Sequence, residues 1–149
     1  MNPINHSQML IHVIFSTKNQ TPLITAEVEP LLYDKISKIL FDELYSPALI
    51  IGGGVEHLHI IVAQSRVVSL ESIIEIVKKR SAEFMRRKIA GFDWQEGYGA
   101  FSINRAADEF EIKYIADQKE FHQKVSYKDE FRQFLDRHNI EYDEDGLWD

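Results

Sequence analysis

The sequence of 149 residues predicts an α+β fold with a four-stranded antiparallel sheet. Two observations lead to this class. Four short segments are rich in β-branched or aromatic residues, as strands are, and longer segments between them have apolar residues at helical spacing. Their order is strand, helix, strand, strand, helix, strand, and two further helices follow. The βαββαβ order is typical of the ferredoxin-like arrangement, in which two helices cover one face of the sheet and leave the other face free for a site or for the extra helices.

The first half of the chain supplies three strands and a helix. Residues 10–17 (LIHVIFST) are mostly β-branched or aromatic, which predicts a strand. Residues 26–44 have apolar positions at helical spacing, and Thr25 is a plausible N-cap for this helix. A short apolar run at 48–51 leads into three glycines, which predicts a strand that ends in a flexible turn. Residues 57–64 (HLHIIVAQ) predict the next strand.

The second half supplies the last strand and three helices. Ser69 begins a segment with a helical apolar stripe that continues to about Ala90, beside Gly91. The remaining elements expected are a strand at 94–103 (WQEGYGAFSI) and helices at 108–121 and 127–137.

The composition is that of a globular chain, with 44% hydrophobic and 28% charged residues. We expect a single domain over residues 1–149, with a core at about 8–122 and a C-terminal helix and acidic tail at about 123–149. No apolar run reaches the roughly 18 residues of a membrane span, and residues 1–8 resemble no secretion signal. The absence of cysteine excludes disulfides, thiolate zinc sites and cysteine nucleophiles, and it fits a cytoplasmic protein.

The triplet His57-Leu58-His59 places two imidazoles on one face of a strand, because side chains alternate along a strand. The aliphatic residues Leu58, Ile60 and Val62 lie on the opposite face and are expected to pack against the helices. Two imidazoles at positions i and i+2 on the open face can share one metal ion. Histidines on a half-exposed strand with no ligand role would give the same pattern.

Charge is segregated along the chain, although the formal net charge is −7. One predicted helix has six basic residues and a single acid between positions 78 and 88, whereas residues 129–149 have eight acids and two arginines. Such a pattern fits a surface that binds a polyanion, and a solvated helix face would look the same. The candidate DNA-binding residues are Lys78, Lys79, Arg80, Arg86, Arg87 and Lys88.

Beyond these patterns, the chain resembles the single-tyrosine HUH transposases of simple insertion sequences, which are TnpA-like, and the related REP-associated tyrosine transposases. The stretches that carry the resemblance are HVIFSTKNQTPLI at 12–24, IGGGVEHLHIIV at 51–62, FDWQEGYGAFSI at 92–103, KYIADQKEFH at 113–122 and FRQFLDRHNIEYDEDGLWD at 131–149. They follow one another in the order and spacing of that family.

The resemblance implies a role for each matching residue. His57 and His59 correspond to the family's two metal-ligating histidines, Tyr114 to its nucleophile, and Gln118 to its third ligand. The ion would be Mg²⁺ or Mn²⁺. The family's partner is single-stranded DNA, including hairpin ends, and its members form homodimers in which the tyrosine helix of one subunit completes the site of the other.

Two positions depart from the family pattern. Glu56 stands where many members have aspartate before the first histidine, and Phe121-His122 stands where many have two successive histidines. The rival tyrosine, Tyr98, lies between two glycines in a predicted strand and is expected to pack or to stack on a base. His12 shares a strand face with Leu10 and Ile14 and is expected to be structural, although it could lie near the site.

The implied reaction is DNA transposition, in which strands are cleaved and rejoined through a 5′-phosphotyrosine intermediate with metal assistance. Two other functions remain open on the sequence. One is a non-catalytic ferredoxin-like module that binds single-stranded nucleic acid. The other is a metal-dependent phosphodiesterase that uses activated water and forms no covalent adduct.

Overall fold

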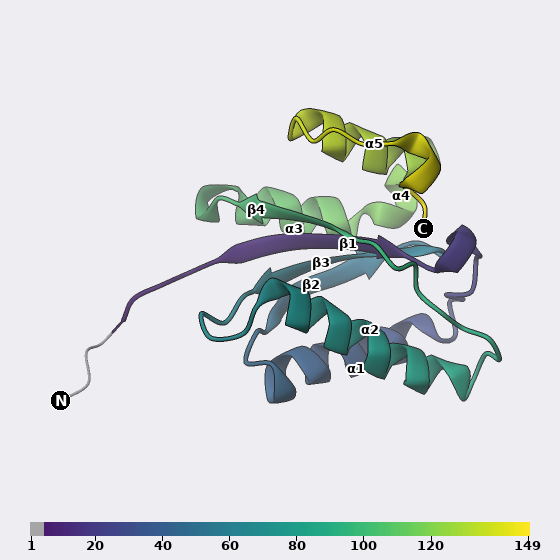
Figure 1. Ribbon diagram of the computed structural model, residues 1–149, viewed down its shortest axis with the longest axis horizontal. Helices are drawn as coiled ribbons and strands as arrows, with labels where there is room; N and C mark the ends of the chain where they lie inside the picture. The colour runs from purple at the N-terminus through teal and green to yellow at the C-terminus, as the bar shows by residue number, and fades with distance from the viewer. Residues whose placement is uncertain (1–4) are drawn as a thin grey trace.

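The computed structural model describes residues 5–149, which form a four-stranded antiparallel sheet with helices on both faces (Figure 1). The strands are β1 (Leu10–Ser16), β2 (Ala48–Gly53), β3 (His57–Ala63) and β4 (Gly99–Ile103), in the spatial order β2-β3-β1-β4. Strand β1 pairs with β3 and with β4, so that Ile14 lies opposite His59 and Gly99. This is the ferredoxin-like order that the sequence predicts, and the α+β fold class is confirmed.

Helices α1 (Glu29–Lys38) and α2 (Leu70–Arg86) cover one face of the sheet. A π-helical turn, η2 (Ile39–Glu43), continues α1, and the Ser69 side chain caps α2 by accepting a hydrogen bond from the Ser72 amide. The main core lies between these helices and the sheet, with Val13, Phe15, Leu58, Ile60 and Val62 from the two central strands. Alternation therefore directs the aliphatic residues of β3 toward the helices, as predicted.

Helices α3 (Asp108–Ala116), α4 (Gln118–Phe121) and α5 (Tyr127–Arg137) cover the opposite face (Figure 1). Two glycines let these helices approach closely. A Cβ at Gly52 would lie 2.5 Å from the Ile115 carbonyl oxygen of α3, and one at Gly99 would lie 2.7 Å from the Phe131 ring of α5. A second apolar cluster joins α5 to the sheet, with Ile14, Phe101, Tyr127, Phe131, Phe134 and Leu135 as its members.

Short 3-10 turns complete the structure: η1 (Lys18–Gln20), η3 (Arg105–Ala107) and η4 (Glu144–Gly146). The last of these belongs to the acidic tail, which is held against the domain. Arg132 of α5 pairs with Glu144, and Trp148 packs beside Tyr127 and Phe131. In the described residues, no helix has both the length and the apolar character needed to span a membrane.

Four predicted elements differ in extent from the observed ones, and one of them is the helix predicted to continue to about Ala90, which ends at Arg86. The helix predicted at 26–44 begins only at Glu29, and no side chain caps it. The strand predicted at 94–103 begins at Gly99, and Trp94 contributes only an isolated bridge to Thr17. The helix predicted at 108–121 breaks at Asp117, whose backbone leaves helical geometry, at φ −93° and ψ 15°. Tertiary packing decides these ends, because apolar periodicity alone does not determine where a helix stops.

A buried histidine–carboxylate cluster beside Tyr114

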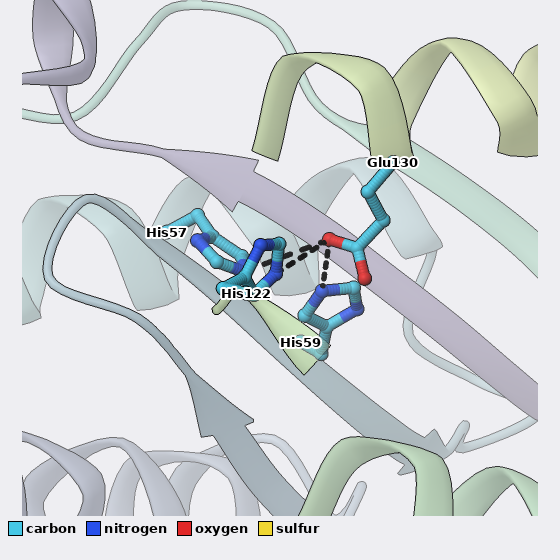
Figure 2. Close-up of side chains that lie close together, drawn as sticks. All are labelled: His57, His59, His122 and Glu130. Atoms are coloured by element: carbon cyan, nitrogen blue, oxygen red, sulfur yellow. Dashed lines mark hydrogen bonds and ion pairs between the residues drawn. The ribbon is translucent and has the colours of Figure 1, made fainter. Parts of the chain in front are cut away.

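His57 and His59 project from β3 toward α3, α4 and α5, and both side chains are fully buried. They thus lie on one face of the sheet, as alternation predicts, with Leu58 on the other. Their rings meet edge to face, with centroids 5.1 Å apart. Each ring turns its Nε2 atom toward the same carboxylate, that of Glu130 (Figure 2).

Glu130 comes from α5 and lies at the centre of the site with an exposed fraction of 1%. Its Oε1 atom is 3.0 Å from His59 Nε2, 3.1 Å from His122 Nε2 and 3.7 Å from His57 Nε2. The three imidazoles and the carboxylate offer four ligand atoms within 4.8 Å of one another (Figure 2). Strand β3, the end of α4 and helix α5 thus bring together groups that are up to 73 positions apart in the chain.

Gln118 supplies a fifth donor. The break at Asp117 lets α4 start with Gln118, whose side chain is buried. Its Oε1 atom lies 3.0 Å from His57 Nε2 and 2.7 Å from His122 Nε2. Its amide nitrogen donates a hydrogen bond to Glu130 Oε2 at 2.9 Å.

Tyr114 of α3 is half-buried, and its hydroxyl donates a hydrogen bond to Glu130 Oε2. Its ring meets the His59 ring edge to face, with centroids 5.9 Å apart. Burial and the neighbouring carboxylate raise the pKa of Tyr114 above its ordinary value, so the phenol is neutral at rest. The two oxygens of Glu130 therefore face different groups: Oε1 faces imidazoles and Oε2 faces Tyr114.

The electrostatics of the cluster follow from burial and hydrogen bonding. Burial tends to raise the pKa of Glu130, but hydrogen bonds from His122 and His59 outweigh it and hold that pKa well below its usual range. Burial lowers the pKa of His59 to about 3, against the opposing pull of Glu130. Burial tends to lower the pKa of His122, but the hydrogen bond to Glu130, the charge of that carboxylate and the hydrogen bond to the Val125 carbonyl together raise it. The cluster thus keeps a carboxylate ionised away from water.

The donor set suits a divalent cation. Three imidazoles, an ionised carboxylate and an amide oxygen converge, and no sulfur ligand is present among them. Nitrogen and oxygen donors of this kind are used for ions such as Mn²⁺, and the carboxylate and amide oxygens suit Mg²⁺. A buried carboxylate among imidazoles also supplies the negative charge that such an ion requires.

Two further polar residues support the histidines. Glu56 contacts His57 Nδ1, so the glutamate in place of aspartate still reaches the ring. His12 of β1 contacts His59 Nδ1 at 2.8 Å. Where many family members have two successive histidines, this chain keeps only the second, His122, and that residue belongs to the cluster.

Sequence reasoning missed Glu130 because it counted this residue within an acidic tail. A signal was present: Tyr127, Glu130, Phe131 and Phe134 recur at helical spacing, so an acid stands on the apolar stripe of α5. An acid in that position is buried and needs partners, which marks it as a site residue.

Four of the six basic candidates lie on α2, which is across the sheet from the cluster (Figure 1), and Arg87 and Lys88 directly follow its last residue. Lys78 is held by the carbonyl oxygens of Gln95, Glu96 and Gly97, at 2.8, 3.1 and 2.6 Å. Two other members have partners within the chain: Arg80 pairs with Glu43, and Arg86 with Asp93. The more exposed members of the set are Lys79, Arg86, Arg87 and Lys88.

Tyr98 contacts a different part of the protein from the histidine–carboxylate cluster. It packs against the core under α1 and α2, and its hydroxyl donates to Glu71 of α2 at 2.8 Å. It therefore belongs to the other face of the sheet from His57 and His59.

Comparison with known proteins places the chain in a family. The family model "Transposase IS200 like" matches residues 5–118, more than three quarters of the chain. The chain therefore belongs to the IS200-like transposases, and its class of enzyme is transposase. The matched segment ends at Gln118, so His122 and Glu130 lie beyond it.

Two solved structures share the fold. One is a protein of Deinococcus radiodurans R1 assigned as a transposase, with a TM-score of 0.64 and 16% identity over 79% of this chain and 96% of that one. The other is a REP-associated tyrosine transposase bound to a REP hairpin, with a TM-score of 0.62 and 16% identity over 84% of this chain and 76% of that one. The comparison with curated proteins found no match.

Proposed function

We propose that this transposase cleaves and rejoins single-stranded DNA with Tyr114 as its nucleophile, and that the buried cluster holds the Mg²⁺ or Mn²⁺ ion that assists it. One observation carries the proposal. A single carboxylate, Glu130, contacts both the Tyr114 hydroxyl and the imidazoles that can ligate a metal. A nucleophile and a cation site are thereby held side by side, as phosphoryl transfer requires.

The residues of the donor set are His57, His59 and Gln118, together with His122 and Glu130. A divalent cation bound there supplies a Lewis acid that polarises the scissile phosphate. Glu56 and His12 contact the Nδ1 atoms of the two strand histidines, so the opposite ring nitrogens face the cluster.

Glu130 Oε2 is the natural acceptor for the Tyr114 proton, because it already receives that hydrogen bond. As the proton leaves, the phenolic oxygen bonds to phosphorus, and the bond from phosphorus to the 3′-oxygen of the preceding nucleotide breaks. The strand then carries a 5′-phosphotyrosine link and a free 3′-hydroxyl, which takes up a proton. Rejoining is the reverse attack by a 3′-hydroxyl, with no need for ATP.

The DNA strand can approach through a surface pocket of about 640 Å³ that Tyr114 lines together with Phe110, Phe121 and Lys124. Phe110 is 74% exposed, although it is a large apolar residue. An aromatic ring of this kind can stack on an unpaired base, which favours a single-stranded substrate.

We further propose that the site is completed within one chain. The resemblance implies homodimers with sites completed in trans, but here Tyr114 reaches Glu130 beside its own His59. Completion in cis needs no change in this arrangement, whereas completion in trans requires α3 to leave it.

The test is adduct formation on a labelled single strand that carries a hairpin end, in Mn²⁺, analysed on a denaturing gel. The wild-type protein and Tyr98→Phe should form a covalent protein–DNA band, and Tyr114→Phe should not. Cleavage by Tyr114→Phe without an adduct would favour the phosphodiesterase. Binding without cleavage by the wild-type protein would favour the non-catalytic module.

A further inference from the structure

His12 is a buried titratable side chain on β1 to which the proposed reaction assigns no step. Its exposed fraction is 1%, and it lies outside the four-residue cluster found among residues 5–149. Both of its ring nitrogens have polar partners. Nε2 is 2.8 Å from His59 Nδ1, and Nδ1 is 3.4 Å from a carboxylate oxygen of Glu111 on α3. A continuous chain of polar contacts therefore runs from Glu111 through His12 to His59.

The direction of this chain follows from what each atom can do. A carboxylate offers lone pairs only, so the Nδ1 atom of His12, 3.4 Å from Glu111, is the nitrogen that carries the proton. In the neutral imidazole, the other nitrogen of His12 then has a lone pair and accepts from His59 Nδ1–H. With a divalent cation bound, the Nε2 atom of His59 keeps its lone pair for the ion, whereas without metal the same atom donates to Glu130 Oε1 at 3.0 Å. Protonation at Nδ1 alone is the tautomer a metal-ligating imidazole needs.

Packing holds the middle ring in place. The His12 ring meets Phe134 of α5 edge to face, with centroids 5.2 Å apart, and lies 5.0 Å from the His59 ring. Ile61 of β3 pairs with His12 across the sheet, so the distance between the two histidines is set by strand register. A residue held by register, by α3 and by α5 is well placed to fix the orientation of its neighbour.

We infer that Glu111 and His12 are positioning residues that hold His59 in the orientation and tautomer required for binding the divalent cation. The inference rests on the proposed metal site. It gives the α3 helix a second role, because the helix that bears Tyr114 also bears Glu111 three positions earlier. Packing of α3 against β1 would then orient His59 for the cation and bring Tyr114 to the site at the same time.

The test measures the affinity for Mn²⁺ alone by electron paramagnetic resonance, without DNA. The variants are His12→Phe, which keeps an aromatic ring but removes both polar contacts, and Glu111→Gln, which keeps the size of the side chain. The matched control is Glu109→Gln, because Glu109 is an exposed acid on the same helix. We expect the dissociation constant to rise roughly 10- to 100-fold for His12→Phe. For Glu111→Gln we expect a rise of at least about threefold, and for Glu109→Gln a change within about twofold.

A spectroscopic readout separates positioning from a loss of stability. Long-range ¹H–¹⁵N spectra of the Mg²⁺-loaded protein should show His59 protonated at Nδ1 in the wild type. In His12→Phe that single tautomer should be lost. Glu111 has a side-chain exposure of 20%, so Glu111→Gln should fold even if His12→Phe does not. Wild-type Mn²⁺ affinity in Glu111→Gln, with an unchanged His59 spectrum, would overturn the inference and leave the metal site standing. If the wild-type protein bound no Mn²⁺, the proposed site and the inference would both fall, whereas loss of the Tyr114 adduct alone would affect only the proposed nucleophile.

Discussion

Replacement of Glu130 by glutamine tests the residue on which the cluster and the nucleophile both depend. The substitution keeps the shape of the side chain and removes its charge. The amide oxygen can still accept from His59 and His122, which contact Oε1 at 3.0 and 3.1 Å. The amide nitrogen, however, would replace Oε2, where Tyr114 and Gln118 now donate.

The magnitude follows from those contacts. The Tyr114 hydroxyl can rotate and accept from the new amide, but the Gln118 NH₂ group cannot accept and is left facing another donor. A buried donor without a partner costs about 1–3 kcal/mol, and the hydrogen bonds to a charged acceptor are weakened as well. We expect the free energy of unfolding of the metal-free protein to fall by about 2 kcal/mol, which lowers Tm by roughly 4–8 °C in a domain of this size.

The functional losses should be larger. Without the carboxylate, Mn²⁺ affinity should fall at least about tenfold, equivalent to about 1.4 kcal/mol. Loss of the proton acceptor should lower the rate of adduct formation by roughly 100-fold or more at saturating Mn²⁺. The assays are thermal unfolding without metal, electron paramagnetic resonance of Mn²⁺, and single-turnover adduct formation.

Asp136→Asn is the matched control, because Asp136 is an exposed acid of the same helix, α5, that is not part of the cluster. It should match the wild-type protein in all three assays. If Glu130→Gln bound Mn²⁺ and formed adduct as the wild-type protein does, Glu130 would be neither a ligand nor the proton acceptor, and the reasoning would be refuted.

Three other predictions concern assembly, DNA binding and packing. A mixture of Tyr114→Phe and His59→Ala proteins should form no adduct, because a site completed in cis cannot be restored by exchange of helices between chains. The double variant Lys79→Ser/Arg87→Ser should bind a hairpin more weakly, and the slope of log K against log salt should decrease by about 1–2 if both side chains contact phosphates. Gly99→Ala should lower the free energy of unfolding by about 1–3 kcal/mol, because the added methyl group would overlap a ring of α5.

Each of these has a control and a result that would contradict it. Adduct from the mixed proteins would establish trans sites and a dimer. If Lys79→Ser/Arg87→Ser bound the hairpin with wild-type affinity, the DNA-binding surface would not include these residues. Lys128→Ser serves as the comparison, because Lys128 is an exposed cation on the other face of the sheet. Gly146→Ala has no heavy atom within 4 Å of the added Cβ, so it should be neutral, and equal stability of the two glycine variants would argue against the close approach.

Glu130 lies outside the segment that matches the family model. The family match ends at Gln118, whereas the carboxylate that joins the donors comes from α5. Helix α5 is anchored by Phe131 and Phe134 against β1 and β4, so the C-terminal region contributes directly to the site. Truncation of α5 should therefore remove Glu130 from the cluster and also disrupt the apolar packing of Phe131 and Phe134.

The local sequence determined the strands, the helices and the face on which the two β3 histidines lie. Alternation along His57-Leu58-His59 is a covalent property of an extended chain, and it settles which side chains share a face before any packing is known. The spacing of four between Tyr114 and Gln118 predicts side chains on one helical face; the helix breaks between them at Asp117, and both side chains nevertheless donate to Glu130. The resemblance in the motifs then identified the family, which the family model confirms.

Only the tertiary structure decided which distant groups meet at the site. Glu130 is 71 positions from His59, and His12 is 47 positions from it, so no local periodicity relates them. Strand register brings His12 beside β3, and the apolar stripe of α5 turns Glu130 inward because Phe131 and Phe134 must be buried. The helix break at Asp117 also belongs to the tertiary structure, because a new helical turn starts at Gln118 and directs the Gln118 amide into the cluster. Long-range packing selects among the conformations that local propensity allows, and for that reason the full set of candidate ligands emerged only in the folded chain.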